Sequence, residues 1–190
     1  MKIRGTIRGV AACTAFCAAL VGSSQDAHAV SISSDNLDTS GNGVTDWSLY
    51  YSEGTSLAYH YGSNTALARS GGGVMLLQSS GSVSASMWKR FKWGNQNITL
   101  NVCSLQVYLK KAFTSTQPVR LTLFNTNSNT LVAQQTVNVT STAYTFFRLQ
   151  NTGNCEEAGM TVGIEAVGNG SSLAGVLVDD ISINWGVPLG

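Results

Sequence analysis

GVLVDDISINW, residues 175–185, is the stretch around which the rest of the chain is organised, and it predicts one long β-strand. Alternate side chains of a strand share a face, so Leu177, Asp179 and Ile181 are expected together with Ile183 on the inward face. A carboxylate among inward aliphatic side chains is costly unless something neutralises it. We therefore expect a cation at Asp179. The alternative is that backbone amides of an adjacent loop bond this carboxylate without a metal.

Upstream of this strand, short alternating segments are separated by turns rich in Gly, Ser and Asn, and convincing helical periodicity is absent from residues 30–190. Residues 82–93 alternate well and place Trp88 on the outward face. Residues 99–111 change parity, which predicts a β-bulge near Cys103 or Ser104. The pattern is typical of an all-β protein, a β-sandwich or jelly roll built from two antiparallel sheets.

The start of the chain has the three features of a secretory signal peptide. They are a basic head, an apolar run and a small-x-small site: Lys2, Arg4 and Arg8, then residues 10–21, then Ala27-His28-Ala29. The alternative, a retained membrane anchor, needs about 20 apolar residues and the run is shorter. We predict a signal peptide over residues 1–29, a single secreted domain over residues 30–190, and no membrane attachment after cleavage.

Charge and cysteine content exclude several classes of function. The net charge is +1 and charged residues make up 11% of the chain, which argues against nucleic acid as the main partner. Cys103 and Cys155 remain after the leader and predict one disulfide in an exported protein; two free thiols are the alternative. A catalytic cysteine lacks support because His60 is the only histidine left, and we expect it to be a hydrogen-bonded surface side chain.

Several segments, in this order, resemble jelly-roll carbohydrate-binding modules, the broad galactose-binding-like group that includes the cellulose- and xylan-binding modules of secreted glycoside hydrolases. The matching segments are Asn36-Leu37-Asp38 followed by Trp47, residues 65–73, Tyr144, and Val178-Asp179-Asp180-Ile181-Ser182-Ile183. The chain departs from the family pattern at two positions, where Asp38 replaces the usual Glu and Leu37 the usual aromatic residue.

The resemblance implies a structural calcium ion that joins the amino-terminal loop to the last strand, with Asp38 and Asp179 as carboxylate ligands. Calcium takes six to eight oxygen ligands in such sites. It also implies that the strands containing Trp88, Thr122, Gln134 and Glu165 form one sheet. The ligand-binding residues expected on its outer face are Trp88, Arg90, Arg120, Phe124 and Glu165. Tyr108, Tyr144 and Phe146 are expected on the outer face of the other sheet, covered by the amino-terminal segment.

The sequence thus predicts a secreted, monomeric, non-catalytic module that binds a polysaccharide or a cell-surface glycan. Aromatic rings stack on the C–H groups of sugars, and arginine donates to their hydroxyls. The alternatives are an extracellular structural or protein-interaction protein and, third, a small polysaccharide-active enzyme. We predict no catalytic residues, because no pair of carboxylates stands out as the two that glycoside hydrolysis needs.

Overall fold

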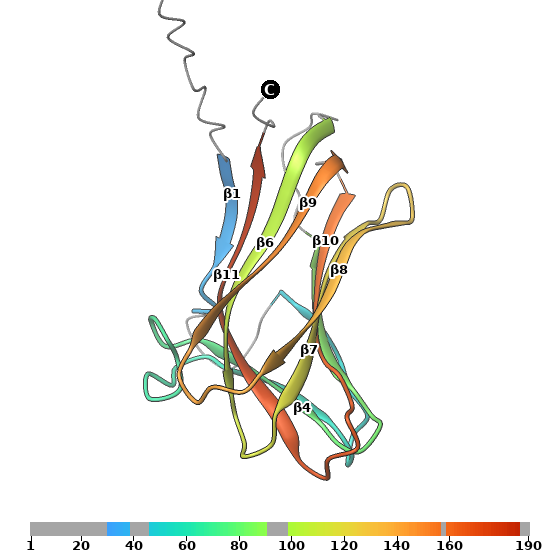
Figure 1. Ribbon diagram of the computed structural model, residues 1–190. Helices are drawn as coiled ribbons and strands as arrows, with labels where there is room; N and C mark the ends of the chain where they lie inside the picture. The colour runs from blue at the N-terminus through green and yellow to red at the C-terminus, as the bar shows by residue number, and fades with distance from the viewer. Residues whose placement is uncertain (1–29, 39–45, 91–98, 157–158, 187–190) are drawn as a thin grey trace, which may run out of the picture.

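The structure is a computed structural model that describes residues 30–38, 46–90, 99–156 and 159–186. The described part of the chain forms a β-sandwich of antiparallel strands (Figure 1). The strands are β1 (Val30–Asp35), β2 (Ser48–Tyr50), β3 (Leu57–Tyr61), β4 (Val74–Ser79), β5 (Ala85–Arg90), β6 (Thr99–Lys111), β7 (Gln117–Asn125), β8 (Thr130–Val139), β9 (Thr145–Glu156), β10 (Met160–Ala166) and β11 (Ala174–Gly186). The predicted fold class, a jelly-roll sandwich of two antiparallel sheets, is confirmed.

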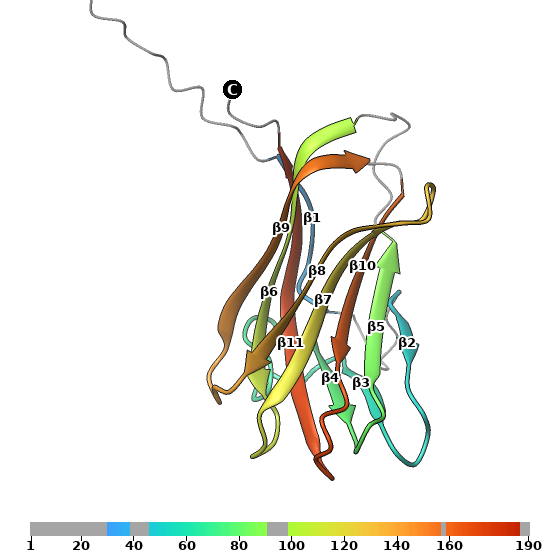
Figure 2. The same ribbon diagram turned by 45° about the vertical axis from the view of Figure 1, so that its right-hand side comes forward.

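Two sheets make up the layers. One, here called sheet A, has the order β3-β4-β11-β6-β9, and β1 pairs with the second half of β11. The other, sheet B, has the order β2-β5-β10-β7-β8. Figure 2 shows β2, β5, β10, β7 and β8 side by side in one layer. The prediction that the strands of Trp88, Thr122, Gln134 and Glu165 share a sheet is therefore confirmed.

The core lies between the sheets and is filled by the inward side chains of both. On β5 the inward residues are Ala85 and Met87, which are buried, whereas Trp88 points outward as predicted. Lys89 has inward parity, and its ammonium group bonds Asp35 of β1 at 2.8 Å. Because β1 belongs to sheet A and β5 to sheet B, this ion pair connects the two sheets at the edge of the core.

The last strand contains a bulge that changes which of its residues face the core. Asp179 is opposite Tyr108 and Ser182 is opposite Gln106, so β11 has one residue more than β6 over this interval. Asp180 adopts a φ of 45° there, a left-handed conformation that Asp tolerates better than most residues.

Across this bulge the inward face switches from even to odd residue numbers. Val176 and Val178 pack in the core with Ile181 and Ile183. Leu177 packs in a separate cluster with Val74 and Leu76. The prediction that Leu177 and Asp179 share the inward face with Ile181 and Ile183 was wrong.

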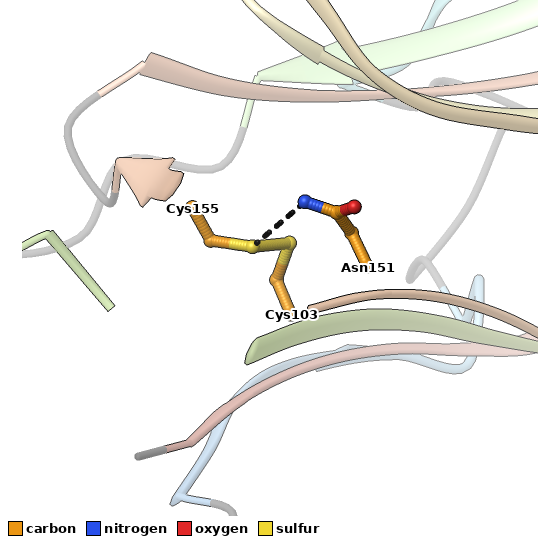
Figure 3. The surroundings of a disulfide bond; sticks show 3 residues. All are labelled: Cys103, Asn151 and Cys155. Atoms are coloured by element: carbon orange, nitrogen blue, oxygen red, sulfur yellow. Dashed lines mark hydrogen bonds between the residues drawn. A yellow bond between two sulfur atoms is a disulfide. The ribbon is translucent and has the colours of Figure 1, made fainter. Parts of the chain in front are cut away.

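Cys103 and Cys155 form the predicted disulfide, which links β6 to β9 (Figure 3). Their Cα atoms are 5.9 Å apart and 52 positions apart in the sequence. The Asn151 amide donates a hydrogen bond to Cys155 Sγ at 3.8 Å. In the chain-entropy model, closing a loop of this size stabilises the folded state by about 4 kcal/mol.

The predicted signal peptide, residues 1–29, lies outside the described residues. Within the described part, there is no helix with the length and apolar character needed to cross a membrane.

Candidate functional site

The outer face of sheet B arranges its side chains in rows that run across the strands. One row joins Arg90 on β5, Thr161 on β10 and Phe124 on β7; the next joins Trp88, Gly163 and Thr122; the third joins Ser86, Glu165 and Arg120. Each row follows from the antiparallel register, because residues directly opposite one another project from the same face. All five predicted ligand-binding residues therefore lie on this face.

A groove of about 430 Å³ opens on this face and is lined by Tyr50, Trp88, Phe124, Thr126 and Thr161. Three aromatic side chains from three different strands thus surround one space. Tyr50 on β2 is 60% exposed. The Trp88 indole donates from Nε1 to the Ser86 hydroxyl at 3.1 Å, which fixes the orientation of the ring. Of the predicted residues, Trp88 and Phe124 line the groove.

The three charged residues of the prediction lie outside the groove lining and are paired. The Arg120 guanidinium bonds the Glu165 carboxylate at 3.0 Å across neighbouring strands. Arg90 donates from Nη2 to Asn127 Oδ1 at 2.8 Å. Both arginines are therefore held in place beside the aromatic residues. A guanidinium carries five N–H donors in a planar arrangement.

Tyr50 is the aromatic residue of the groove that sequence reasoning missed. It belongs to β2, a strand of three residues whose pairing with Trp88, Met87 and Ser86 of β5 sets its position. The one available signal was the aromatic pair Tyr50-Tyr51 in a segment with strand-like character.

The two predicted metal ligands are both bonded by one loop, residues 69–73. Asp179 is fully buried. It accepts hydrogen bonds from the backbone amides of Arg69 at 2.6 Å, Ser70 at 3.2 Å and Asp180 at 2.7 Å. Asp38 accepts from the amides of Gly72 and Gly73. This loop therefore makes the connection between the amino-terminal segment and the last strand that calcium was predicted to make.

Glycine is required in this loop because it passes very close to the amino-terminal segment. A Cβ at Gly71 would lie 1.7 Å from an oxygen of Asp38, and one at Gly73 would lie 1.7 Å from the Leu37 carbonyl oxygen. Gly71 also has a φ of 56°, which glycine adopts without steric cost.

These contacts do not fit a calcium site. Calcium binds oxygen atoms, but the groups directed at both carboxylates are N–H donors, whose positive ends face the position that a cation would occupy. The described residues contain no cluster of three or more His, Cys, Asp or Glu side chains able to hold a metal ion. The arrangement favours the alternative of bonding by loop amides. Calcium binding itself stays a prediction.

The electrostatics of the buried Asp179 and of the half-buried Asp35 differ. Burial raises the pKa of Asp179, and the amide hydrogen bonds from Arg69, Asp180 and Ser70 oppose this only in part. At Asp35, burial acts in the same direction, but hydrogen bonds from Lys89, Trp47 and the Leu37 amide outweigh it and hold the pKa below its ordinary value. A cationic partner is thus present at Asp35, whereas Asp179 relies on amide dipoles.

His60 also differs from expectation, since it is buried and not on the surface. Its Nε2 makes the predicted kind of hydrogen bond, to the Leu37 carbonyl oxygen at 2.8 Å. This contact helps to hold the amino-terminal segment against β3, so His60 has a structural role.

No protein-family model matches the chain, and a search of curated proteins found no relative. Solved structures share its fold at low sequence identity. The CBM22-1 xylan-binding domain of Paenibacillus barcinonensis Xyn10C superposes with a TM-score of 0.58 and 11% identity, over 84% of this chain and 97% of that domain. The module TmCBM61, solved with β-1,4-galactotriose, has a TM-score of 0.50 and 12% identity over 72% and 86% of the two chains.

The same fold also occurs in proteins of another kind. A Stig cyclase from Fischerella sp. TAU superposes with a TM-score of 0.62 and 14% identity, over 84% of this chain and all of that protein. A shared fold therefore does not decide the function. What these similarities establish is that the chain has the jelly-roll fold found in carbohydrate-binding modules, as the sequence resemblance predicted.

Proposed function

We propose that the mature chain is exported and binds a polysaccharide or cell-surface glycan, without catalysis, in the groove of sheet B. The observation that carries this proposal is the convergence of Tyr50, Trp88 and Phe124 on one open groove. Aromatic faces provide the apolar surface on which sugar C–H groups stack. The neighbouring Arg120–Glu165 and Arg90–Asn127 pairs supply donors and acceptors for sugar hydroxyls.

The arrangement of charges on this face supports binding without hydrolysis. Glycoside hydrolysis needs two carboxyl groups that flank the scissile bond. The three rows described above carry a single carboxylate, Glu165, and it is bonded to Arg120. Glu165 therefore serves to hold Arg120 and to accept hydrogen bonds.

Similarity of fold adds to this proposal. One of the superposed structures is a xylan-binding domain, and another is a module in complex with β-1,4-galactotriose. Xylan and β-1,4-galactan are therefore the first ligands to test, together with cellulose.

The test is retention of the purified mature protein on insoluble xylan, galactan and cellulose, followed by the Trp88→Ala variant. Tyr59→Ala is the matched control, because Tyr59 is 49% exposed but belongs to β3 of sheet A. We expect retention on at least one polysaccharide, loss of it in Trp88→Ala and no change in Tyr59→Ala. Absence of binding across a wide glycan panel would favour the structural or protein-interaction alternative, and release of reducing sugar would favour an enzyme.

A further inference from the structure

The Trp88 ring lies directly over a glycine of the neighbouring strand. Gly163 on β10 is paired with Trp88 on β5 and with Thr122 on β7. A Cβ atom at Gly163 would lie 2.4 Å from Cη2 and Cζ3 of Trp88 and 2.6 Å from Cε3. Real Cβ atoms do not approach other atoms so closely, so the ring occupies the space that any other residue's side chain would need.

The distances also show how the ring is oriented. Three consecutive ring carbons are almost equally far from the same point. A ring approached edge-on would present one or two carbons and leave the next clearly farther away. Near-equal distances to three carbons therefore mean that one face of the ring lies against Gly163. Since Trp88 also lines the groove, its opposite face is directed into it.

We propose that Gly163 is a positioning residue of the groove, a role that rests on the proposed glycan binding. By lacking a side chain, Gly163 lets the Trp88 indole lie flat on the sheet, and the hydrogen bond to Ser86 sets its rotation. The groove floor is then a flat aromatic surface, which suits a pyranose ring that presents a face of C–H groups. A side chain at position 163 tilts the indole and removes that surface while Trp88 itself remains.

The first test compares Gly163→Ala, Trp88→Ala and the double variant by affinity electrophoresis in soluble xylan and in β-1,4-galactan. Alanine is at least as well tolerated as glycine within a strand, so the fold should persist, which a melting curve checks. We expect each single variant to weaken binding at least about tenfold. In the Trp88→Ala background the Gly163→Ala change should have almost no further effect, because the ring that it displaces is gone. Wild-type affinity in Gly163→Ala, or additive losses in the double variant, would overturn the proposal.

The second test needs no ligand and separates this proposal from the proposed function. The fluorescence of Trp88 is obtained by subtracting the spectrum of each Trp88→Ala protein from that of its Trp88-containing counterpart. Gly163→Ala should change the emission maximum and increase quenching of Trp88 by acrylamide. An unchanged Trp88 signal would show that Gly163 does not position the ring, whereas a changed signal in a protein that binds no glycan would refute only the proposed function.

Discussion

The outer faces of the two sheets both carry aromatic side chains, but their surroundings differ. On sheet B, Tyr50, Trp88 and Phe124 border an open groove. On sheet A, the Arg69 guanidinium lies 3.5 Å from the centre of the Tyr108 ring, and Lys110 Nζ lies 4.4 Å from that of Tyr144. Aromatic composition alone therefore does not identify a binding face. What matters is whether other side chains of the same protein already cover the rings.

The cover on sheet A comes from Arg69 in the loop that bonds the two aspartates, from Leu67 just before that loop, and from Lys110 of β6. The Tyr144 hydroxyl donates to the Leu67 carbonyl oxygen at 2.9 Å, and Arg69 forms an ion pair with Asp180. The expected cover for Tyr108, Tyr144 and Phe146 was the amino-terminal segment, whereas Arg69 lies over Tyr108, and Leu67 and Lys110 contact Tyr144. Phe146 stays exposed and packs against Tyr108 with ring centres 5.4 Å apart.

Removing the buried carboxylate of sheet A should have the largest effect. Asp179→Ala leaves the amides of Arg69, Ser70 and Asp180 without their acceptor, and we expect a loss of unfolding free energy on the order of 3 kcal/mol. Urea denaturation measures this, with Glu53→Ala, an exposed carboxylate, as the control. Affinity for glycan should be unchanged in the folded variant, because the groove lies on sheet B. A stability loss no larger than that of the control would mean that the loop is held in another way.

Removing the Trp88 indole from sheet B should weaken glycan binding and leave the stability of the fold nearly unchanged. Trp88→Ala deletes the aromatic floor of the groove, and a residue of this kind contributes on the order of 2 kcal/mol to binding, about thirtyfold in affinity. Isothermal titration with xylohexaose or a galactan oligomer gives the value. Equal losses in Trp88→Ala and Tyr59→Ala would erase the distinction between the two faces.

Acidification should weaken the ion pair between Lys89 and Asp35, which connects the two sheets. The pKa of Asp35 is depressed in the folded protein, because hydrogen bonds from Lys89, Trp47 and the Leu37 amide outweigh the effect of burial. The stability that Asp35 contributes is therefore present above its unfolded pKa of about 4 and is lost as the pH falls through the lower folded value.

Asp179 acts in the opposite sense, since its pKa is raised by burial; its protonation on acidification favours the folded state. Asp35→Asn removes the carboxylate whose contribution to stability is lost in acid. The melting temperature of this variant should therefore fall less steeply than that of the wild type between pH 7 and pH 2. Parallel curves for the two proteins would show that Asp35 contributes no pH dependence.

Calcium should have the smallest effect. Because amides already occupy the carboxylate oxygens of Asp38 and Asp179, we expect equal melting temperatures in EDTA and in millimolar calcium. A ligand that binds only the folded state raises the melting temperature. A clear rise with calcium would support the ion that the family resemblance implies and would overturn our assignment of the loop amides as the partners of both aspartates.

Local alternation of side chains was sufficient to predict the sandwich and the outward position of Trp88, whereas the face shared by the five candidate residues was predicted from the family resemblance. Local alternation failed for residues whose orientation depends on how their strand pairs with the neighbouring strands. The bulge at Asp180 exists only relative to β6, so nothing in residues 175–185 shows that Asp179 leaves the inward face. The bulge predicted near Cys103 or Ser104 is not on β6: the register between β6 and β9 shifts between Leu100 and Val102, and the extra residue there belongs to β9.

The composition of the candidate site could be predicted only in part. Trp88 and Phe124 follow from strand parity, whereas Tyr50 reaches the groove through the pairing of a three-residue strand with β5. The ion pair between Arg120 and Glu165 could not be predicted either, because it depends on the register between β7 and β10.

The most direct test of the central claim, that glycan binds the groove of sheet B, is a titration of the ¹⁵N-labelled mature protein with xylohexaose and with β-1,4-galactotriose, followed by NMR. The account predicts that the amide signals that shift belong to β2, β5, β7 and β10, around Tyr50, Trp88 and Phe124. Shifts confined to sheet A, around Tyr108 and Phe146, would contradict it.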